Sequence, residues 1–310
     1  MEYLIAMTVN EALGMTSGGR PARYVAGGTD LAVQLAGGRA AIAAFAPASS
    51  RPPCRASPPG FAPASMPGFA LLPDALVDVS GIPELLHLER GPGGLVVGAA
   101  VTIERLAAAG GLPACLVQGA RAIGSPQVRA LATLGGNLCN ASPCGDCLAP
   151  VVVLGGRLVL ASPAGRREVP AEEFFTGPKA TVLRAGELLV EVLFGAEALE
   201  GRSAFRMIGQ RNAQAISQVN VAVWVRIEAG KVAEIRAAAG SVAPTPIRLH
   251  SAERVVRGRP WSHGLGRQAG EAAAAEVRPI DDVRSPAGYR RRVTAALFRE
   301  TLAEACEGRL

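Results

Sequence analysis

Apolar positions in the first part of the chain fall into short runs separated by Gly, Pro and charged residues. Runs rich in Val, Leu and Ile predict strands, and runs in which apolar residues recur every three to four positions predict helices. We predict strands at 24–26, 75–79, 95–97, 148–154 and 157–160, and helices at 30–35, 102–109 and 113–123. This mixture of elements favours an α+β arrangement.

Longer alternating runs follow in the C-terminal part of the chain. They predict a meander of strands at 188–194, 203–208, 219–227 and 232–239, with Gly230-Lys231 as the turn of the last hairpin. Helices are predicted at 251–256, 267–275 and 287–306. We place the domain boundary near Gly177-Pro178, which gives domains 1–177 and 178–310, each with its own sheet.

The segment at about 40–72 has no such pattern. It is rich in Ala, Pro and Ser, contains Pro52-Pro53 and Pro58-Pro59, and shows no clear periodicity. A segment of this composition cannot bury enough apolar surface in a fixed geometry. We therefore predict a poorly ordered loop within the first domain.

Composition narrows the class of protein. The 310 residues are 49% hydrophobic and 19% charged, which is typical of a soluble globular protein. No apolar run approaches the ~20 residues of a membrane span, and the N-terminus lacks a signal-peptide pattern. We therefore expect a cytoplasmic protein that does not bind a membrane. The net charge of +6 comes almost entirely from dispersed arginines, and aromatic residues make up only 4%. Nucleic-acid binding is therefore not predicted.

Two glycine pairs carry the most specific signal. The first lies in Val25-Ala26-Gly27-Gly28-Thr29-Asp30 and the second in Thr133-Leu134-Gly135-Gly136-Asn137. Adjacent glycines permit positive φ, so successive N–H groups can converge on an anion, and Thr29 and Asn137 add side-chain donors. We predict two halves of one anion site, with two ordinary Gly-Gly turns as the alternative. Neither pair has the spacing of a dinucleotide-binding or phosphate-loop motif.

The motifs resemble those of the FAD-binding subunit of the molybdenum hydroxylases, the family of xanthine dehydrogenase. Besides the two glycine pairs, the likeness rests on Asn140-Ala141-Ser142-Pro143 with Asp146, on 73–85, on Gly209-Gln210-Arg211, on 216–222, on 242–248 and on 279–284. This resemblance implies an FAD-binding domain of the p-cresol methylhydroxylase type, made of two α/β subdomains. A smaller C-terminal domain of the CO dehydrogenase flavoprotein type would follow it.

The resemblance also implies residue roles, with the FAD pyrophosphate between the two glycine pairs. Cys139 and Asn140 would line the flavin, and Asp146 would bind the ribose or adenine end unless it is a solvated turn carboxylate. Asp30 either contributes to the site or caps the helix behind the first pair. The full set of candidate cofactor residues is Val25, Ala26, Gly27, Gly28, Thr29, Asp30, Thr133, Gly135, Gly136, Asn137, Cys139, Asn140 and Asp146.

One departure from the family concerns a cation near the flavin. Relatives often place a lysine shortly before the Gly-x-Arg motif, where this chain has Met207. A nearby cation stabilises negative charge on reduced flavin, whereas methionine supplies only packing. Arg206 or Arg211 could take over this role, or both could be surface arginines.

The cysteines permit three interpretations. Cys139-x4-Cys144-x2-Cys147 has the spacing of three ligands of a plant-type [2Fe-2S] centre, and the fourth would have to be Cys54, Cys115 or Cys306. A redox-active pair of Cys144 and Cys147 is the second interpretation. We favour the third interpretation, in which the cysteines are simple reduced thiols. We predict no metal site, because the histidines lack metal-ligand spacing. We also predict no catalytic residues, because no serine or cysteine nucleophile constellation is present.

The resemblance implies a function as the electron outlet of a heteromeric enzyme. A large molybdenum cofactor-binding subunit would oxidise a purine, N-heterocycle or aldehyde, and a small subunit would relay electrons through [2Fe-2S] clusters. FAD on this chain would pass them to NAD+ or another acceptor. The alternatives are a flavin-binding assembly subunit with little activity alone and a stand-alone flavoprotein oxidase. Substrate, acceptor and subunit stoichiometry leave no signature in this sequence.

Overall fold

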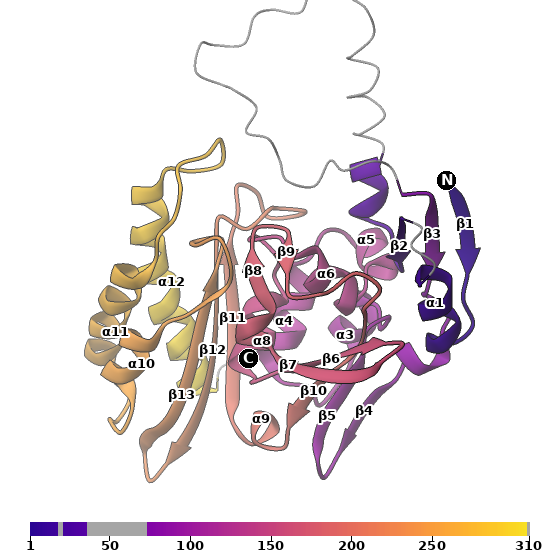
Figure 1. Ribbon diagram of the computed structural model, residues 1–310. Helices are drawn as coiled ribbons and strands as arrows, with labels where there is room; N and C mark the ends of the chain where they lie inside the picture. Colours follow the sequence, from indigo (N-terminus) through magenta and orange to yellow (C-terminus); the bar gives the residue numbers. More distant parts are fainter. Residues whose placement is uncertain (18–20, 36–72, 309–310) are drawn as a thin grey trace, which may run out of the picture.

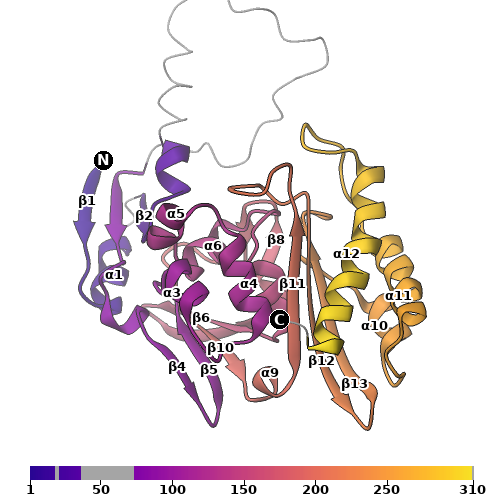
Figure 2. The same cartoon turned by 180° about the vertical axis from the view of Figure 1, so that it is seen from behind.

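The computed structural model describes residues 1–17, 21–35 and 73–308. Three blocks lie side by side, each with a sheet of its own (Figures 1 and 2). The N-terminal block and the five-stranded central block enclose the candidate site, and the C-terminal block packs against the central one. The loop predicted at 40–72 lies outside the described residues.

The N-terminal block is a parallel three-stranded sheet with one helix. Its strands are β1 (Glu2–Ile5), β2 (Ala22–Val25) and β3 (Ala75–Asp78), in the order β1-β3-β2, and α1 (Val9–Thr16) follows β1. Thr8 begins α1 by accepting a hydrogen bond from the Glu11 N–H. Of these elements, β2 and β3 were predicted from the sequence, whereas β1 and α1 were not. Residues 31–35 are helical, as predicted, up to the end of the described range.

The central block is an antiparallel sheet covered by short helices. The strands β4 (Leu88–Gly91), β5 (Gly94–Gly98), β10 (Leu188–Gly195), β6 (Arg157–Ser162) and β7 (Gly165–Pro170) pair in that order. The helices are α3 (Ile103–Ala108), α4 (Ala114–Ala122), α5 (Pro126–Leu131), α6 (Leu134–Asn140) and α7 (Leu148–Val153). Shorter elements are η2 (Pro83–Leu85), α8 (Ala171–Phe174), β8 (Phe175–Gly177), β9 (Ala180–Thr181) and α9 (Glu197–Glu200).

Two predictions in the central block are wrong. Residues 148–153 of the run 148–154 form helix α7, and all six residues of this helix are buried, so it is apolar on every side. A short apolar run cannot distinguish a buried strand from a buried helix. The strand at 188–194 does not start a C-terminal meander, because β10 pairs with β5 on one side and with β6 on the other.

This pairing bears on the domain boundary, which we predicted near Gly177-Pro178. A division there would separate β10 from both of its neighbours in the sheet. We propose instead that the boundary lies at 196–201, between β10 and β11.

The C-terminal block is an antiparallel sheet backed by three helices. It contains β11 (Arg202–Ile208), β12 (Val219–Glu228), β13 (Lys231–Gly240) and β14 (Ile247–Arg248), in that order. The helices α10 (His250–Val256), α11 (His263–Glu276) and α12 (Ala287–Glu307) were all predicted, although α11 begins earlier than expected. The turn between β12 and β13 is formed by Ala229 and Gly230, one position earlier than predicted. Both have positive φ, as a type I′ hairpin turn requires.

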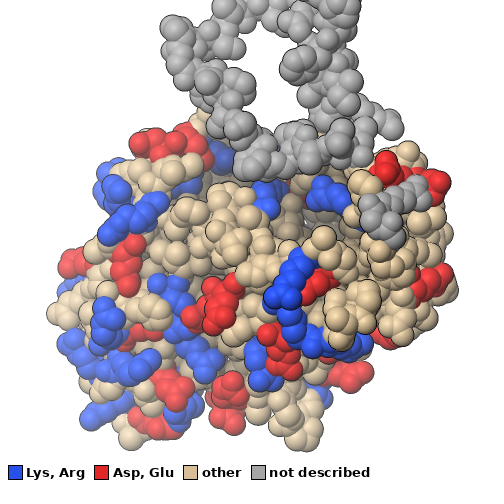
Figure 3. Space-filling view, viewed as in Figure 1, with Lys and Arg blue, Asp and Glu red and all other residues tan. Residues whose placement is uncertain are grey.

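Charged side chains are dispersed over the surface. On the face shown in Figure 3, Lys and Arg side chains are interspersed with Asp and Glu side chains rather than gathered into one basic field. None of the helices in the described ranges has the length and apolar content that a membrane span needs.

Candidate cofactor site

A cavity of about 640 Å³ lies between the N-terminal block and helix α6. Segments far apart in the sequence line it, among them 23–31, 132–146 and Lys179, together with Ile216 and Arg284 of the C-terminal block. Every candidate cofactor residue lines this cavity except Gly135, which lines a neighbouring one. The structure therefore brings the two predicted glycine pairs together.

The first glycine pair forms an open loop between β2 and the helix at 31–35. Gly27 packs directly on the chain that leads into α6, since a Cβ added there would lie 1.9 Å from the Leu131 carbonyl oxygen. Gly28 has a φ of +65°, which favours glycine. No hydrogen bond among the described residues uses the backbone N–H groups of Ala26, Gly27, Gly28 or Thr29. The loop thus lines the cavity with backbone donors that have no partner among the described residues.

The second glycine pair lies in the first turn of α6 instead of in a loop. The Gly135 N–H donates to the Ala99 carbonyl oxygen at 2.8 Å and the Asn137 N–H to that of Thr133 at 3.0 Å. Thr133 caps the helix, because its Oγ1 accepts from the Gly136 N–H at 3.1 Å. The backbone donors predicted for this pair are therefore already bonded within the protein, to Ala99 and to Thr133, and contact of this pair with the cofactor stays a prediction.

Glycine is nevertheless needed in α6 for packing. A Cβ added to Gly135 would lie 2.7 Å from both the Cβ and the carbonyl oxygen of Ala99, at the end of β5. Asn137 of α6 lines the cavity, and its Oδ1 atom is buried and has no partner among the described residues. An unpaired buried amide oxygen is costly unless a ligand or water donates to it.

Asp146 lies in the wall of the cavity next to the C-terminal block, with 5% of its surface exposed. Its Oδ1 accepts hydrogen bonds from Ser217 Oγ at 2.5 Å and from Asn220 Nδ2 at 3.0 Å. Burial raises the pKa of this carboxyl to about 6, although the two hydrogen bonds oppose the rise. The alternative of a solvated turn carboxylate is wrong, and the expected role toward the ribose or adenine end stays a prediction.

Lys179 is a residue of the site that sequence reasoning missed. Its Nζ lies 3.1 Å from Asp30 Oδ2 and 2.7 Å from Asn140 Oδ1, so it links the first glycine loop to the end of α6. The amide of Gln34 also donates to both acceptors. The carboxylate of Asp30 makes side-chain contacts here, and no helix-capping hydrogen bond by it occurs within the described ranges.

The cations expected near the flavin lie elsewhere. Arg206 pairs with Glu304 of α12 at 2.7 Å, Arg211 donates to the Gln214 carbonyl oxygen, and Met207 packs against the core of the central block. Among the described residues, the Lys and Arg side chains that line the cavity are those of Arg23, Lys179 and Arg284.

Cys139, Cys144 and Cys147 do not form a set of metal ligands in the described part of the chain. No group of three or more His, Cys, Asp or Glu residues there could hold a metal ion, and Cys54 lies outside it. Cys139 and Cys144 line the cavity, whereas Cys147 is buried. Burial raises the pKa of the Cys147 thiol, which disfavours the thiolate that a metal or a redox partner would need.

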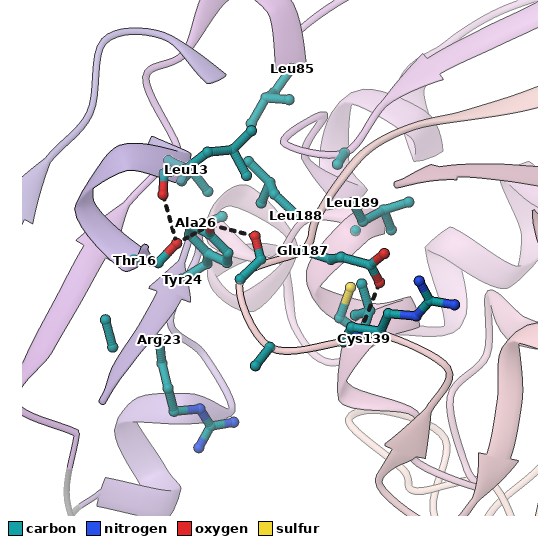
Figure 4. A pocket seen from close by; sticks show the side chains of 18 of the residues that line it. Leu13, Thr16, Arg23, Tyr24, Ala26, Leu85, Cys139, Glu187, Leu188 and Leu189 are labelled. Carbon is teal, nitrogen blue, oxygen red and sulfur yellow. Dashed lines mark hydrogen bonds between the residues drawn. The ribbon is translucent and has the colours of Figure 1, made fainter. Parts of the chain in front are cut away.

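A second cavity of about 830 Å³ adjoins the first, and Figure 4 shows a close view of it. Leucines of α1, η2 and β10 line it: Leu13, Leu85, Leu188 and Leu189. Tyr24 lies among them, with its hydroxyl 2.7 Å from Thr16 Oγ1. The two cavities share the lining residues Arg23, Tyr24, Ala26, Gly136 and Cys139, so they meet at the glycine pairs.

Comparisons with known proteins agree with this geometry. Residues 66–194 match the model of the FAD-binding domain in molybdopterin dehydrogenase, and residues 203–305 match that of the CO dehydrogenase flavoprotein C-terminal domain. The chain is 32% identical to the xanthine dehydrogenase FAD-binding subunit of Escherichia coli O157:H7, over 74% of this chain and 80% of that protein. The chain belongs to the family of FAD-binding subunits of molybdenum hydroxylases.

Further relatives support this assignment. The carbon monoxide dehydrogenase medium chain of Hydrogenophaga pseudoflava is 30% identical over 74% of this chain and 81% of its own length. A solved structure of that organism's carbon monoxide dehydrogenase superposes with a TM-score of 0.83 at 28% identity, covering 98% of this chain and 96% of that one. The predicted family, two-domain fold, oxidoreductase class and FAD cofactor are thereby confirmed.

Proposed function

We propose that this chain carries FAD as the electron outlet of a three-subunit molybdenum hydroxylase. In this proposal a small subunit with [2Fe-2S] clusters delivers electrons, and a large molybdenum cofactor-binding subunit oxidises a purine, N-heterocycle or aldehyde. This chain would hold the FAD, whose chemistry would be to take up single electrons and to pass them on as a hydride to NAD+ or to another acceptor. A cytoplasmic location also stays a prediction.

The observation that carries the proposal is the meeting of two cavities at a loop with free N–H groups. FAD has two ring systems joined by a diphosphate. The cavities of about 640 and 830 Å³ meet at Ala26 and Gly136, next to the unpaired donors of 26–29. Backbone N–H groups that point into one concavity are a common way to hold phosphate oxygens. The residues present therefore fit the diphosphate at the loop and one ring system in each cavity.

Within this site, the chain's own residues bind and orient. The free N–H groups of 26–29 would donate to diphosphate oxygens, and the unpaired Oδ1 of Asn137 would accept from a ligand donor or a bound water. The leucine-rich cavity would exclude water from an apolar ring. No acid-base or nucleophilic constellation is needed, because the redox chemistry belongs to the cofactor.

A visible absorption spectrum of the purified full chain tests the proposal, with cofactor release and iron analysis on the same sample. We expect flavin absorption bands whose intensity corresponds to about one FAD per chain, and we expect no iron. A chain that contains no FAD and cannot take it up would contradict the proposal. Broad additional absorption with iron would instead support the cluster interpretation of Cys139, Cys144 and Cys147.

The electron acceptor needs a separate test. If the FAD-loaded chain transfers electrons from NADH to an artificial dye, this result would support NAD+ as the natural acceptor. A loaded chain that is inert to NADH, yet is reduced by dithionite, would favour a different acceptor or the assembly role. Co-purification with molybdenum and iron-sulfur subunits, when these are expressed together, tests the proposed partners.

A further inference from the structure

The negative charge of Asp30 is poorly placed for a site that binds an anion. Asp30 directly follows residues 26–29, whose N–H groups have no partner among the described residues, and it lines the same cavity. A carboxylate beside a diphosphate repels it, because like charges that lie close together in a partly solvated site oppose each other. The cavity therefore needs a cation close to this carboxylate.

Lys179 is the side chain that meets this need. Its ammonium group contacts the Asp30 carboxylate at 3.1 Å and the Asn140 side-chain oxygen at 2.7 Å. The two acceptors hold the ammonium group from opposite elements, the first glycine loop and the end of α6. Of the other cations that line the cavity, Arg284 pairs with Asp282 of its own segment at 3.4 Å.

The backbone at Lys179 supplies an independent observation. Lys179 occupies the second position of the two-residue turn between β8 and β9, after Pro178, with a φ of +60°. A turn with proline first and positive φ second ordinarily has glycine or asparagine at that place. The lysine thus stands where its backbone is disfavoured, and its N–H is fixed by the Ala141 carbonyl oxygen at 2.9 Å.

We propose that Lys179 is a positioning residue that neutralises Asp30 and so makes the first glycine loop compatible with the FAD diphosphate. This inference rests on the proposed binding of FAD at that loop. Lys179 acts through Asp30 in this account and does not itself hold the phosphate. The neutralised carboxylate keeps its contact with Gln34 and anchors the start of the helix at 31–35.

A double-mutant cycle on the purified full chain separates this role from direct phosphate contact. The FAD dissociation constant is measured by fluorescence titration of FAD-free protein for the wild type, Lys179→Met, Asp30→Asn and the double variant. The matched control is Lys231→Met, because Lys231 is the other lysine of the chain and lies on the exposed β12–β13 hairpin. Circular dichroism checks that each variant is folded.

We expect Lys179→Met to weaken FAD binding about tenfold at low salt and less at high salt, because salt screens the uncovered carboxylate. The double variant should return to near the wild-type affinity, and Asp30→Asn alone should bind FAD at least as well as the wild type. Lys231→Met should bind like the wild type.

An equal loss of affinity from Lys179→Met in the wild-type and Asp30→Asn backgrounds would overturn the inference, since it would mean direct contact between Lys179 and the phosphate. An unchanged affinity in the single variant would overturn it as well. Failure of the wild-type chain to bind FAD would instead reject the proposed function, so the two failures are distinguishable.

Discussion

The two glycine pairs of the site look alike in sequence and differ in structure. The pair at Gly27-Gly28 lies in an open loop whose N–H groups have no partner within the described ranges. The pair at Gly135-Gly136 lies in the first turn of α6, where those N–H groups bond to Ala99 and to the cap residue Thr133. One pair presents donors to a ligand, whereas the other lets a helix pack closely against β5. A Gly-Gly motif alone therefore does not identify an anion site.

Substitution of the first pair should have the largest effect. In Gly27→Ala, the added methyl group would lie 1.9 Å from the Leu131 carbonyl oxygen, so the loop must move away from the chain that leads into α6. We expect FAD affinity to fall by about 10- to 100-fold, because moving the loop away from the clash costs about 1–3 kcal/mol. Equilibrium titration with FAD measures this loss.

The matched control for that variant is Gly14→Ala in α1, where an added Cβ meets nothing within 4 Å. It should leave FAD affinity unchanged and stabilise the chain slightly, because alanine favours helices over glycine. A Gly27→Ala chain with wild-type affinity would show that the first loop does not form the site.

Substitution of the second pair should mainly affect folding. In Gly135→Ala, the new methyl group would lie 2.7 Å from Ala99, so α6 must shift away from β5. We expect the free energy of unfolding to fall by about 1–3 kcal/mol, measured by urea denaturation of the FAD-free chain. FAD affinity should fall less than in Gly27→Ala, and the reverse order would break the comparison between the two pairs.

The two carboxylates of the site also differ in their surroundings, because Asp30 is exposed and Asp146 is buried. The folded-state pKa of Asp146 is raised to about 6 from an ordinary value of 3.8. A raised pKa means that the folded chain holds this proton more tightly than the unfolded chain. Its contribution to stability is therefore fully present below pH 3.8 and is lost as the pH rises through 6.

Replacement of Asp146 by asparagine should remove that pH dependence. The stability of Asp146→Asn relative to the wild type should rise by about 1–3 kcal/mol between pH 4 and pH 7. Urea denaturation at several pH values measures it, with Asp30→Asn as the exposed control. A difference that does not change with pH would contradict the raised pKa.

The smallest effect concerns the cap of α6. Thr133→Val keeps the side-chain shape but removes the oxygen that accepts from the Gly136 N–H. We expect a loss of about 1 kcal/mol in the free energy of unfolding, which is typical for a helix cap. A Thr133→Ser variant retains the acceptor and should lose less, and equal losses in both variants would argue against capping.

Much of the site could be predicted because its residues are close in sequence. The motifs around Gly27 and Gly136 each supply several contiguous lining residues, and the order of motifs predicted the family. Local signals also predicted the hairpin of β12 and β13 and the three C-terminal helices. Each of these elements is determined by its own turn or by apolar spacing within one segment.

What could not be predicted depends on partners distant in sequence. The sequence of β10 predicts a strand but not its partners, and only the structure shows that it pairs with β5 and β6. Lys179 carries no motif, and its role follows from a contact with Asp30, 149 residues away. Asp146 likewise meets Ser217 across the boundary between blocks. No sequence signal marks Lys179, because a lysine after proline is ordinary in a type I turn and only the structure shows its positive φ.

Amide hydrogen exchange of the full chain, with and without FAD, tests whether the first glycine pair, and not the second, supplies backbone donors to FAD. We predict that FAD slows exchange at residues 26–29 at least about tenfold, because N–H groups without a partner in the described chain gain acceptors there. Exchange at residues 135–137 should change little, since those N–H groups are already bonded within the protein. Protection gained at 135–137 but absent at 26–29 would contradict the account.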